Sequence, residues 1–326
     1  MPPQDTATLP RLRVFAETVD HRVLRSAAVL EALATRGLQL VLAVRPGDND
    51  PLPVLAAARE AGVCVAVWPM LGDADGRWAS SANASRFADH ARRHLAALER
   101  AGYPPDELCL DLEPPLAVMR RAIDRGAMLG RVGGERARCA FELERLIADA
   151  AAHGVPTWGT VVPLILADER QTPSWQRLLG TPVDALSLRR VSVMLYTSMM
   201  VGYSRGALRR RDAEYLLAAA ALRARERFGA RASVALGAVG RGALGDEATY
   251  LDTDELRTDV AIARAAGIED LALFELAGAL ARPRWQEWLD ALVEPSATSP
   301  VTRASRRARL VWWTSAAVSR LAGVGR

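Results

Sequence analysis

The chain contains no lysine: all 42 of its basic side chains are arginine. This absence excludes Schiff-base lysine chemistry, a pyridoxal-phosphate anchor and the lysine of Walker-type phosphate loops. Histidine and cysteine are also scarce, with four and three residues. No histidine falls at a predicted strand end, so we expect neither a Ser-His-Asp triad nor a histidine general base. The cysteines lack CxxC spacing, which argues against a disulfide framework and a zinc ribbon.

Long apolar runs are missing as well. No uncharged apolar run reaches the roughly 18 residues of a membrane span, and the start lacks the basic-then-apolar pattern of a signal peptide. We therefore expect a cytoplasmic protein. Residues 1–294 carry 36 arginines against 38 acids, whereas the residues after Glu294 carry six arginines and no acid. The basic charge thus belongs to the end of the chain, and we expect no nucleic-acid partner for the rest.

Eight short apolar, β-branched runs recur between helical patterns. The runs are continuous rather than alternating, which is typical of parallel strands covered on both faces. Eight strand–helix units predict that residues 1–294 form one (β/α)8 TIM barrel. An open doubly wound sheet would need a glycine-rich turn after its first strand, and the sequence there is FAETVDHR. The predicted strands are Leu12–Val19, Leu38–Val44, Val63–Met70, Leu108–Leu112, Thr157–Leu164, Val191–Tyr196, Ser233–Val239 and Leu271–Leu276.

The sequence at the end of the chain predicts a linker over residues 295–302 and a basic amphipathic tail over residues 303–326. Leu310, Trp313, Ala317, Leu321 and Val324 fall on one helical face of the tail. Such a segment lies on an anionic membrane or binds a partner protein, or it docks on the barrel as an ordinary helix. Co-sedimentation with liposomes, with and without residues 303–326, separates membrane contact from the other outcomes.

The functional residues of a TIM barrel collect at the C-terminal ends of its strands. Side chains alternate along the fourth strand with a period of two residues. This alternation places Cys109, Asp111 and Glu113 on one face and three leucines on the other. If two carboxyls this close both ionise, their negative charges repel each other. The pKa of one carboxyl is therefore raised, and such a carboxyl suits the role of a general acid near neutral pH. Other strand ends contribute Glu17, Arg45, Trp68, Trp158, Tyr196 and Glu275.

These motifs resemble the chitinase-like (family 18) glycoside hydrolases over roughly residues 60–280. Asp106, Cys109, Asp111 and Glu113 stand in the register of that family's Asp-x-x-Asp-x-Asp-x-Glu motif on strand four. The run 193–197 is similar to its Met-x-Tyr-Asp, 236–242 to its Gly-…-Tyr-Gly-Arg, and 271–276 to its segment ending in Trp-x-Leu-Asp. Three positions differ, because Cys109, Thr197 and Phe274 stand where the family has Asp, Asp and Trp.

The resemblance implies a role for each matching residue. Glu113 would protonate the glycosidic oxygen, and Asp111 would orient the substrate's N-acetyl group, which acts as internal nucleophile. Tyr196 would hydrogen-bond the same group. The implied substrate is an N-acetylhexosamine-type glycan, and neither a cofactor nor a metal is implied. We expect further substrate contacts from Trp68, Trp158, Glu17, Glu275, Phe274 and Arg45.

The residues leave other readings open. Glu113 could pair with Glu275 or Glu17 as a conventional acid and nucleophile, at about 5–5.5 Å in retaining enzymes or about 6.5–9.5 Å in inverting ones. The barrel could bind glycans without catalysis. It could instead hold a phosphorylated metabolite through the glycines of 237–245 and nearby arginines, or magnesium through its rim carboxylates. His90 and His94 have metal-ligand spacing without the HExxH pattern, and we expect them on a solvated surface.

Overall fold

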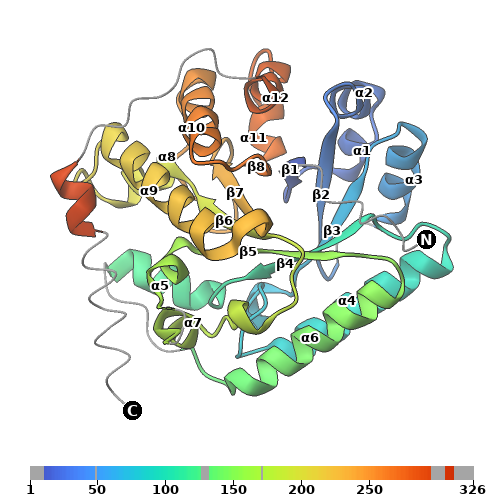
Figure 1. The fold of residues 1–326 in the computed structure, drawn as a ribbon. Helices are drawn as coiled ribbons and strands as arrows, with labels where there is room; N and C mark the ends of the chain where they lie inside the picture. The colour runs from blue at the N-terminus through green and yellow to red at the C-terminus, as the bar shows by residue number, and fades with distance from the viewer. Residues whose placement is uncertain (1–10, 48–49, 126–131, 170–171, 295–304, 312–326) are drawn as a thin grey trace, which may run out of the picture.

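The computed structural model describes residues 11–47, 50–125, 132–169, 172–294 and 305–311. Within these ranges, eight parallel strands pair in chain order and β1 closes on β8 (Figure 1). The predicted (β/α)8 barrel is confirmed, and so are its eight strand positions. The strands are β1 (Leu12–Ala16), β2 (Leu38–Val44), β3 (Val65–Pro69), β4 (Glu107–Leu112), β5 (Thr157–Val161), β6 (Val191–Leu195), β7 (Ala232–Gly237) and β8 (Leu271–Phe274).

Helices cover the outside of the barrel (Figure 1). Two short helices were not predicted, α8 directly after β6 and α11 directly after β8. The sequence predicts one helix over residues 22–36 after the first strand, and Ser26 divides this helix in two. The helices are α1 (His21–Leu24), α2 (Ala27–Thr35), α3 (Leu52–Glu60), α4 (Ala84–Arg100), α5 (Leu116–Arg125), α6 (Arg136–Ala152), α7 (Ser174–Leu179), α8 (Thr197–Tyr203), α9 (Arg210–Phe228), α10 (Thr253–Ala265), α11 (Leu276–Leu280) and α12 (Gln286–Val293).

The strands separate two apolar cores. Leu108, Leu110 and Leu112 of β4 pack outward with the helices, whereas Cys109 packs inside the barrel. This is the alternation that the sequence predicted for β4. The interior core includes Phe15 and Trp158, whose ring centroids lie 5.9 Å apart. Because these large side chains fill the middle of the barrel, a ligand can bind only at one of the barrel's ends.

Below this layer, a buried polar network fills the end of the barrel where the strands begin. Arg13, only 1% exposed, donates from Nε to Gln39 Oε1 at 2.9 Å and from Nη2 to Glu107 Oε2 at 3.3 Å. Its Nη1 also pairs with Asp270, which Arg190 contacts from the other side at 3.1 Å. The network thus ties β1, β2 and β4 to the segments that lead into β6 and β8.

The described part of the tail, residues 305–311, docks on the barrel beside α9 (Figure 1). Ser305 Oγ donates to Asp212 Oδ1 at 2.6 Å, and Ala308 is buried against Leu208, Leu216 and Met200. No helix in the described ranges is long and apolar enough to span a bilayer. The linker and residues 312–326 lie outside the described residues, so membrane or partner contact through them stays a prediction.

The prediction for the histidine pair was wrong. His90 is 6% exposed, and its ring lies 4.5 Å from that of His94. Burial lowers the pKa of both side chains, that of His94 to about 4. The reason is that this face of α4 packs against β3 rather than facing water. Of the cysteines, Cys64 is exposed just ahead of β3, whereas Cys109 and Cys139 are buried.

Candidate active site

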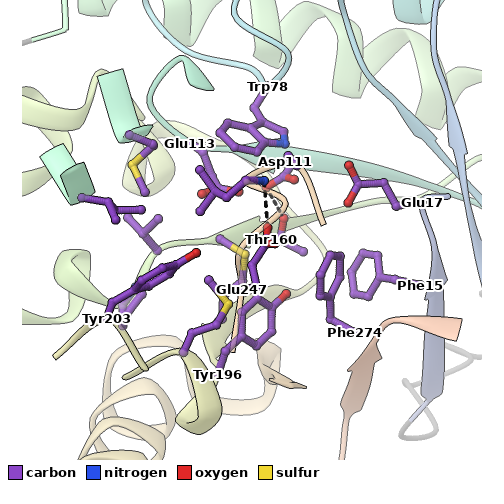
Figure 2. Close-up of a pocket in the computed structure, with 18 of the residues that line it drawn as sticks. Phe15, Glu17, Trp78, Asp111, Glu113, Thr160, Tyr196, Tyr203, Glu247 and Phe274 are labelled. Atoms are coloured by element: carbon purple, nitrogen blue, oxygen red, sulfur yellow. Dashed lines mark hydrogen bonds between the residues drawn. The ribbon is translucent and has the colours of Figure 1, made fainter. Parts of the chain in front are cut away.

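A cavity of about 340 Å³ lies where the barrel strands end (Figure 2). It brings together six of the residues that the sequence nominated, and these come from β1, β3, β4, β6 and β8 or directly follow them. The cavity walls above them come from α5, α8 and the segment after β7. The six nominated residues are Glu17, Trp68, Asp111, Glu113, Tyr196 and Phe274.

Asp111 and Glu113 form a hydrogen-bonded carboxyl pair within this cavity. Burial raises the pKa of Asp111 to about 6, although hydrogen bonds from Thr160 and Glu113 oppose the rise. Burial and then the Asp111 charge raise the pKa of Glu113 well above its ordinary value. At neutral pH, Glu113 therefore keeps its proton beside an ionised Asp111, which is the state that a general acid requires.

Thr160 is a partner of Asp111 that the sequence analysis missed. It stands opposite Asp111 in the β4–β5 register, and its hydroxyl donates to Asp111 Oδ1 at 2.6 Å (Figure 2). Burial raises the pKa of the neighbouring Cys109 thiol well above its ordinary value, so this side chain stays neutral. Asp111 thus has a hydroxyl partner on β5 and a neutral thiol where the resembling family has an acid.

We expect Thr160→Val to move the acidic limb of the pH profile of kcat/KM upward. The Thr160 hydrogen bond favours the ionised carboxylate, so its loss raises the pKa of Asp111 further above about 6. Thr157→Val is the matched control, because Thr157 is also buried on β5 but its hydroxyl has no hydrogen-bond partner among the described residues. An acidic limb that stays in place in Thr160→Val would contradict the role that the resemblance implies for Asp111.

Glu17 lies across the cavity from the carboxyl pair and is bound by an arginine that the sequence analysis also missed. Arg77 Nη1 contacts Glu17 Oε1 at 2.6 Å, and its Nε donates to Asp73 at 2.8 Å. Burial raises the pKa of Glu17 to about 7, and Arg77 opposes the rise. Arg77 adopts a left-handed backbone with φ of 62°, which is uncommon for a residue other than glycine. This backbone conformation shapes the loop before Trp78 so that the Arg77 guanidinium reaches the end of β1.

Tyr196 and Phe274 form an aromatic floor at the ends of β6 and β8. Their rings stack with centroids 5.4 Å apart and an interplanar angle of 21°. Burial, followed by the charges of Asp111 and Glu113, raises the pKa of Tyr196 well above its ordinary value. Tyr196 is therefore a neutral phenol that can donate a hydrogen bond to a ligand.

Three nominated residues do not line the cavity. Trp158 is fully buried one layer lower, with the Arg13 guanidinium 4.6 Å from its ring centroid, so the expected contact between Trp158 and a substrate is wrong. Glu275 turns toward the residues that follow β1: it accepts from the backbone Glu17 N at 3.2 Å and from the side-chain Thr18 Oγ1 at 3.0 Å. These bonds occupy both of its oxygens, which argues against Glu275 as a nucleophile. Arg45 is half-buried, and its charge lowers the pKa of Glu17.

The glycine-rich segment after β7 serves close packing rather than phosphate binding. A Cβ on Gly242 would lie 2.7 Å from the Phe274 ring, and one on Gly240 would lie 2.8 Å from the backbone of Gly278. Arg210 turns away to a buried ion pair with Asp259 at 2.6 Å. Among the described residues that line the cavity there is no arginine, whereas four are carboxylic acids. Such a lining supplies no cation of its own to a phosphate, and the ionised Asp111 repels one.

The carboxyls of the cavity do not form a metal site in the part of the chain that the structure describes. No group of three or more His, Cys, Asp or Glu side chains there is arranged to hold an ion. Glu17 is bound by Arg77, and Asp111 accepts from Thr160, which argues against the alternative of magnesium held by the rim carboxylates.

The fold defines the class of this protein as a TIM barrel. No family model and no curated protein matches the chain. Among solved structures, the glycoside hydrolase domain of PgaB (BpsB) from Bordetella bronchiseptica is 16% identical, with 89% of this chain and 100% of that chain covered and a TM-score of 0.52. A GH18 chitinase from Pseudoalteromonas aurantia is 10% identical, with 86% and 98% covered and a TM-score of 0.50.

The exo-β-1,4-mannosidase Op5Man5 from Opitutaceae bacterium strain TAV5 is 13% identical, with 96% of this chain and 60% of that chain covered and a TM-score of 0.51. The chain therefore shares its barrel with several glycoside hydrolases. Because one barrel fold supports many reactions, this likeness establishes the fold, and the reaction has to be argued from the site.

Proposed function

We propose that this protein is a glycoside hydrolase that cleaves an N-acetylhexosamine-type glycan by substrate-assisted catalysis. The observation that carries the proposal is the buried Asp111–Glu113 pair, in which one carboxyl keeps its proton and its neighbour ionises. This pair faces a cavity at the end of the barrel where catalytic residues collect. The resemblance of the β4 motif to the chitinase-like family supports the same assignment.

In the first step, Glu113 gives its proton to the glycosidic oxygen as the bond from that oxygen to the anomeric carbon breaks. The carbonyl oxygen of the N-acetyl group bonds to the anomeric carbon, and the ionised Asp111 stabilises the positive charge that develops on the acetamido nitrogen. Tyr196 donates a hydrogen bond to the acetamido oxygen. Water then bonds to the anomeric carbon, the bond to the acetamido oxygen breaks, and a proton from the water returns to Glu113.

The test is a panel of chromogenic N-acetylhexosaminides, each paired with the 2-hydroxy glycoside of the same configuration. We expect turnover of at least one N-acetylated substrate and none of its 2-hydroxy partner, because only the former carries the internal nucleophile. Equal turnover of both members of a pair would contradict substrate assistance and would favour Glu17 as an enzyme nucleophile.

A glycan-binding barrel without catalysis is the second candidate, and Thr197 favours it. This residue stands where the resembling family has an acid, and its hydroxyl donates a hydrogen bond to Asp259 of α10. Binding of N-acetylated oligosaccharides without turnover of any substrate in the panel would establish this candidate instead.

A further inference from the structure

The two sides of the cavity differ in chemistry. Figure 2 shows Glu17, Phe15 and Phe274 on one side of the Asp111–Glu113 pair and Tyr203 on the other. The Glu17 side has an ion pair with Arg77 and the aromatic floor. The lining contributed by α5, α8 and the segment after β7 is almost entirely carbon and sulfur. We call it the apolar wall, and it consists of Met119, Ile123, Met199, Met200, Tyr203 and Leu244.

The apolar wall offers few hydrogen bonds to a ligand. The Tyr203 hydroxyl already donates to Asp246 at 3.1 Å. Glu247, next to the wall, accepts from Leu244 N through Oε1 at 2.8 Å, while its buried Oε2 has no partner among the described residues. A second sugar ring would bring several hydroxyls to a wall whose described residues offer two acceptors, the Glu247 Oε2 and the Tyr203 oxygen. Each unpaired hydroxyl would lose its hydrogen bonds to water, which disfavours binding.

The flexibility of the wall suits a flexible apolar group. Methionine is unbranched and polarisable, so it adapts to irregular or mobile apolar ligands. Met200 also packs against the cluster that holds Ala308 of the docked tail segment, where Leu310 is 65% exposed and the neighbouring arginines face solvent. The apolar wall therefore adjoins a basic and apolar surface, an arrangement that suits amphiphilic molecules.

From this arrangement we propose that the leaving group of the substrate is a flexible alkyl or acyl chain, so that the substrate is an amphiphilic glycoside rather than a polysaccharide. The proposal rests on the proposed function for its orientation. The sugar lies over the aromatic floor with its N-acetyl group at Asp111, and Glu113 protonates the oxygen that leads to the other side. The leaving group then meets the apolar wall.

The test measures binding separately from turnover. Methyl, butyl and octyl thioglycosides of N-acetylhexosamines are titrated calorimetrically into the full chain, beside a thio-linked disaccharide. We expect Kd to fall by about fourfold for each methylene that the wall buries, with an increasingly negative heat-capacity change. A Kd independent of chain length, or a disaccharide that binds more tightly than the octyl compound, would overturn the proposal.

Matched leucine variants locate the effect. Leu244→Gln places an amide in the wall and is expected to flatten the dependence of Kd on chain length. Leu222→Gln, on the exposed side of α9, is expected to change no Kd. Chain-length dependence without turnover of any glycoside would refute the hydrolase and leave the apolar binding intact. Turnover with no chain-length dependence would refute this inference alone.

Discussion

Glu113→Gln is expected to lower kcat/KM by about 10²- to 10⁴-fold, the usual contribution of a general acid. Glutamine keeps the size of the side chain and its ability to donate a hydrogen bond to Asp111, but it has no proton to give to the leaving oxygen. The loss should be larger for an alkyl leaving group than for 4-nitrophenol, because the alkoxide depends more on protonation. Steady-state kinetics on both kinds of substrate measures this difference.

The pH profile supplies an independent reading of the same variant. In the wild type, deprotonation of Glu113 is expected to set the alkaline limb, at a pH well above the ordinary range of a carboxyl. Glu113→Gln removes the titrating group, so the alkaline limb should disappear. Glu226→Gln, on the exposed surface of α9, serves as control and should leave both rate and profile unchanged. Full activity in Glu113→Gln would refute the central assignment.

Arg13→Met is expected to lower the free energy of unfolding by about 3–5 kcal/mol, the usual cost of removing one partner from a buried ion pair. The substitution leaves Glu107 and Asp270 buried with less compensating charge, although Arg190 still contacts Asp270. Chemical denaturation followed by circular dichroism measures the change through the transition midpoint.

The control for this prediction is an ion pair at the surface. Arg22→Met breaks the pair with Asp20, in which the Arg22 side chain is 83% exposed. Exposed pairs contribute little because water screens both charges, so no measurable shift of the midpoint is expected. Equal midpoints for Arg13→Met and the wild type would show that the network below the interior core does not stabilise the barrel.

The barrel could be predicted because its strands are buried on both faces and therefore read as continuous apolar runs. The carboxyl pair could be predicted because alternation along β4 fixes the direction of each side chain. Depth inside the barrel was harder to predict. Trp158 and Thr160 both point inward from β5, but β5 begins at Thr157, so Trp158 lies a layer below the site and Thr160 reaches it. Sequence periodicity gives direction, whereas depth depends on where a strand begins.

Residues from outside the strands could not be predicted in the same way. Arg77 reaches Glu17 from a loop, and the bond joins residues 60 positions apart. Glu247 and the methionines of α8 line the cavity from a loop and a seven-residue helix. Loops have no hydrophobic period, and short helices have too little of one to be recognised. The character of the apolar wall thus emerges only when these segments are folded over the barrel.

The distribution of thiols makes the two ends of this barrel chemically distinguishable. Cys64 is the exposed one of the three cysteines, and it stands just before β3 begins, at the end opposite the cavity. With no lysine in the chain, amine-directed reagents find no side chain to modify. A maleimide dye or a surface linker would therefore attach at one point and leave the mouth of the cavity open, so that immobilised molecules would all present it to the solution.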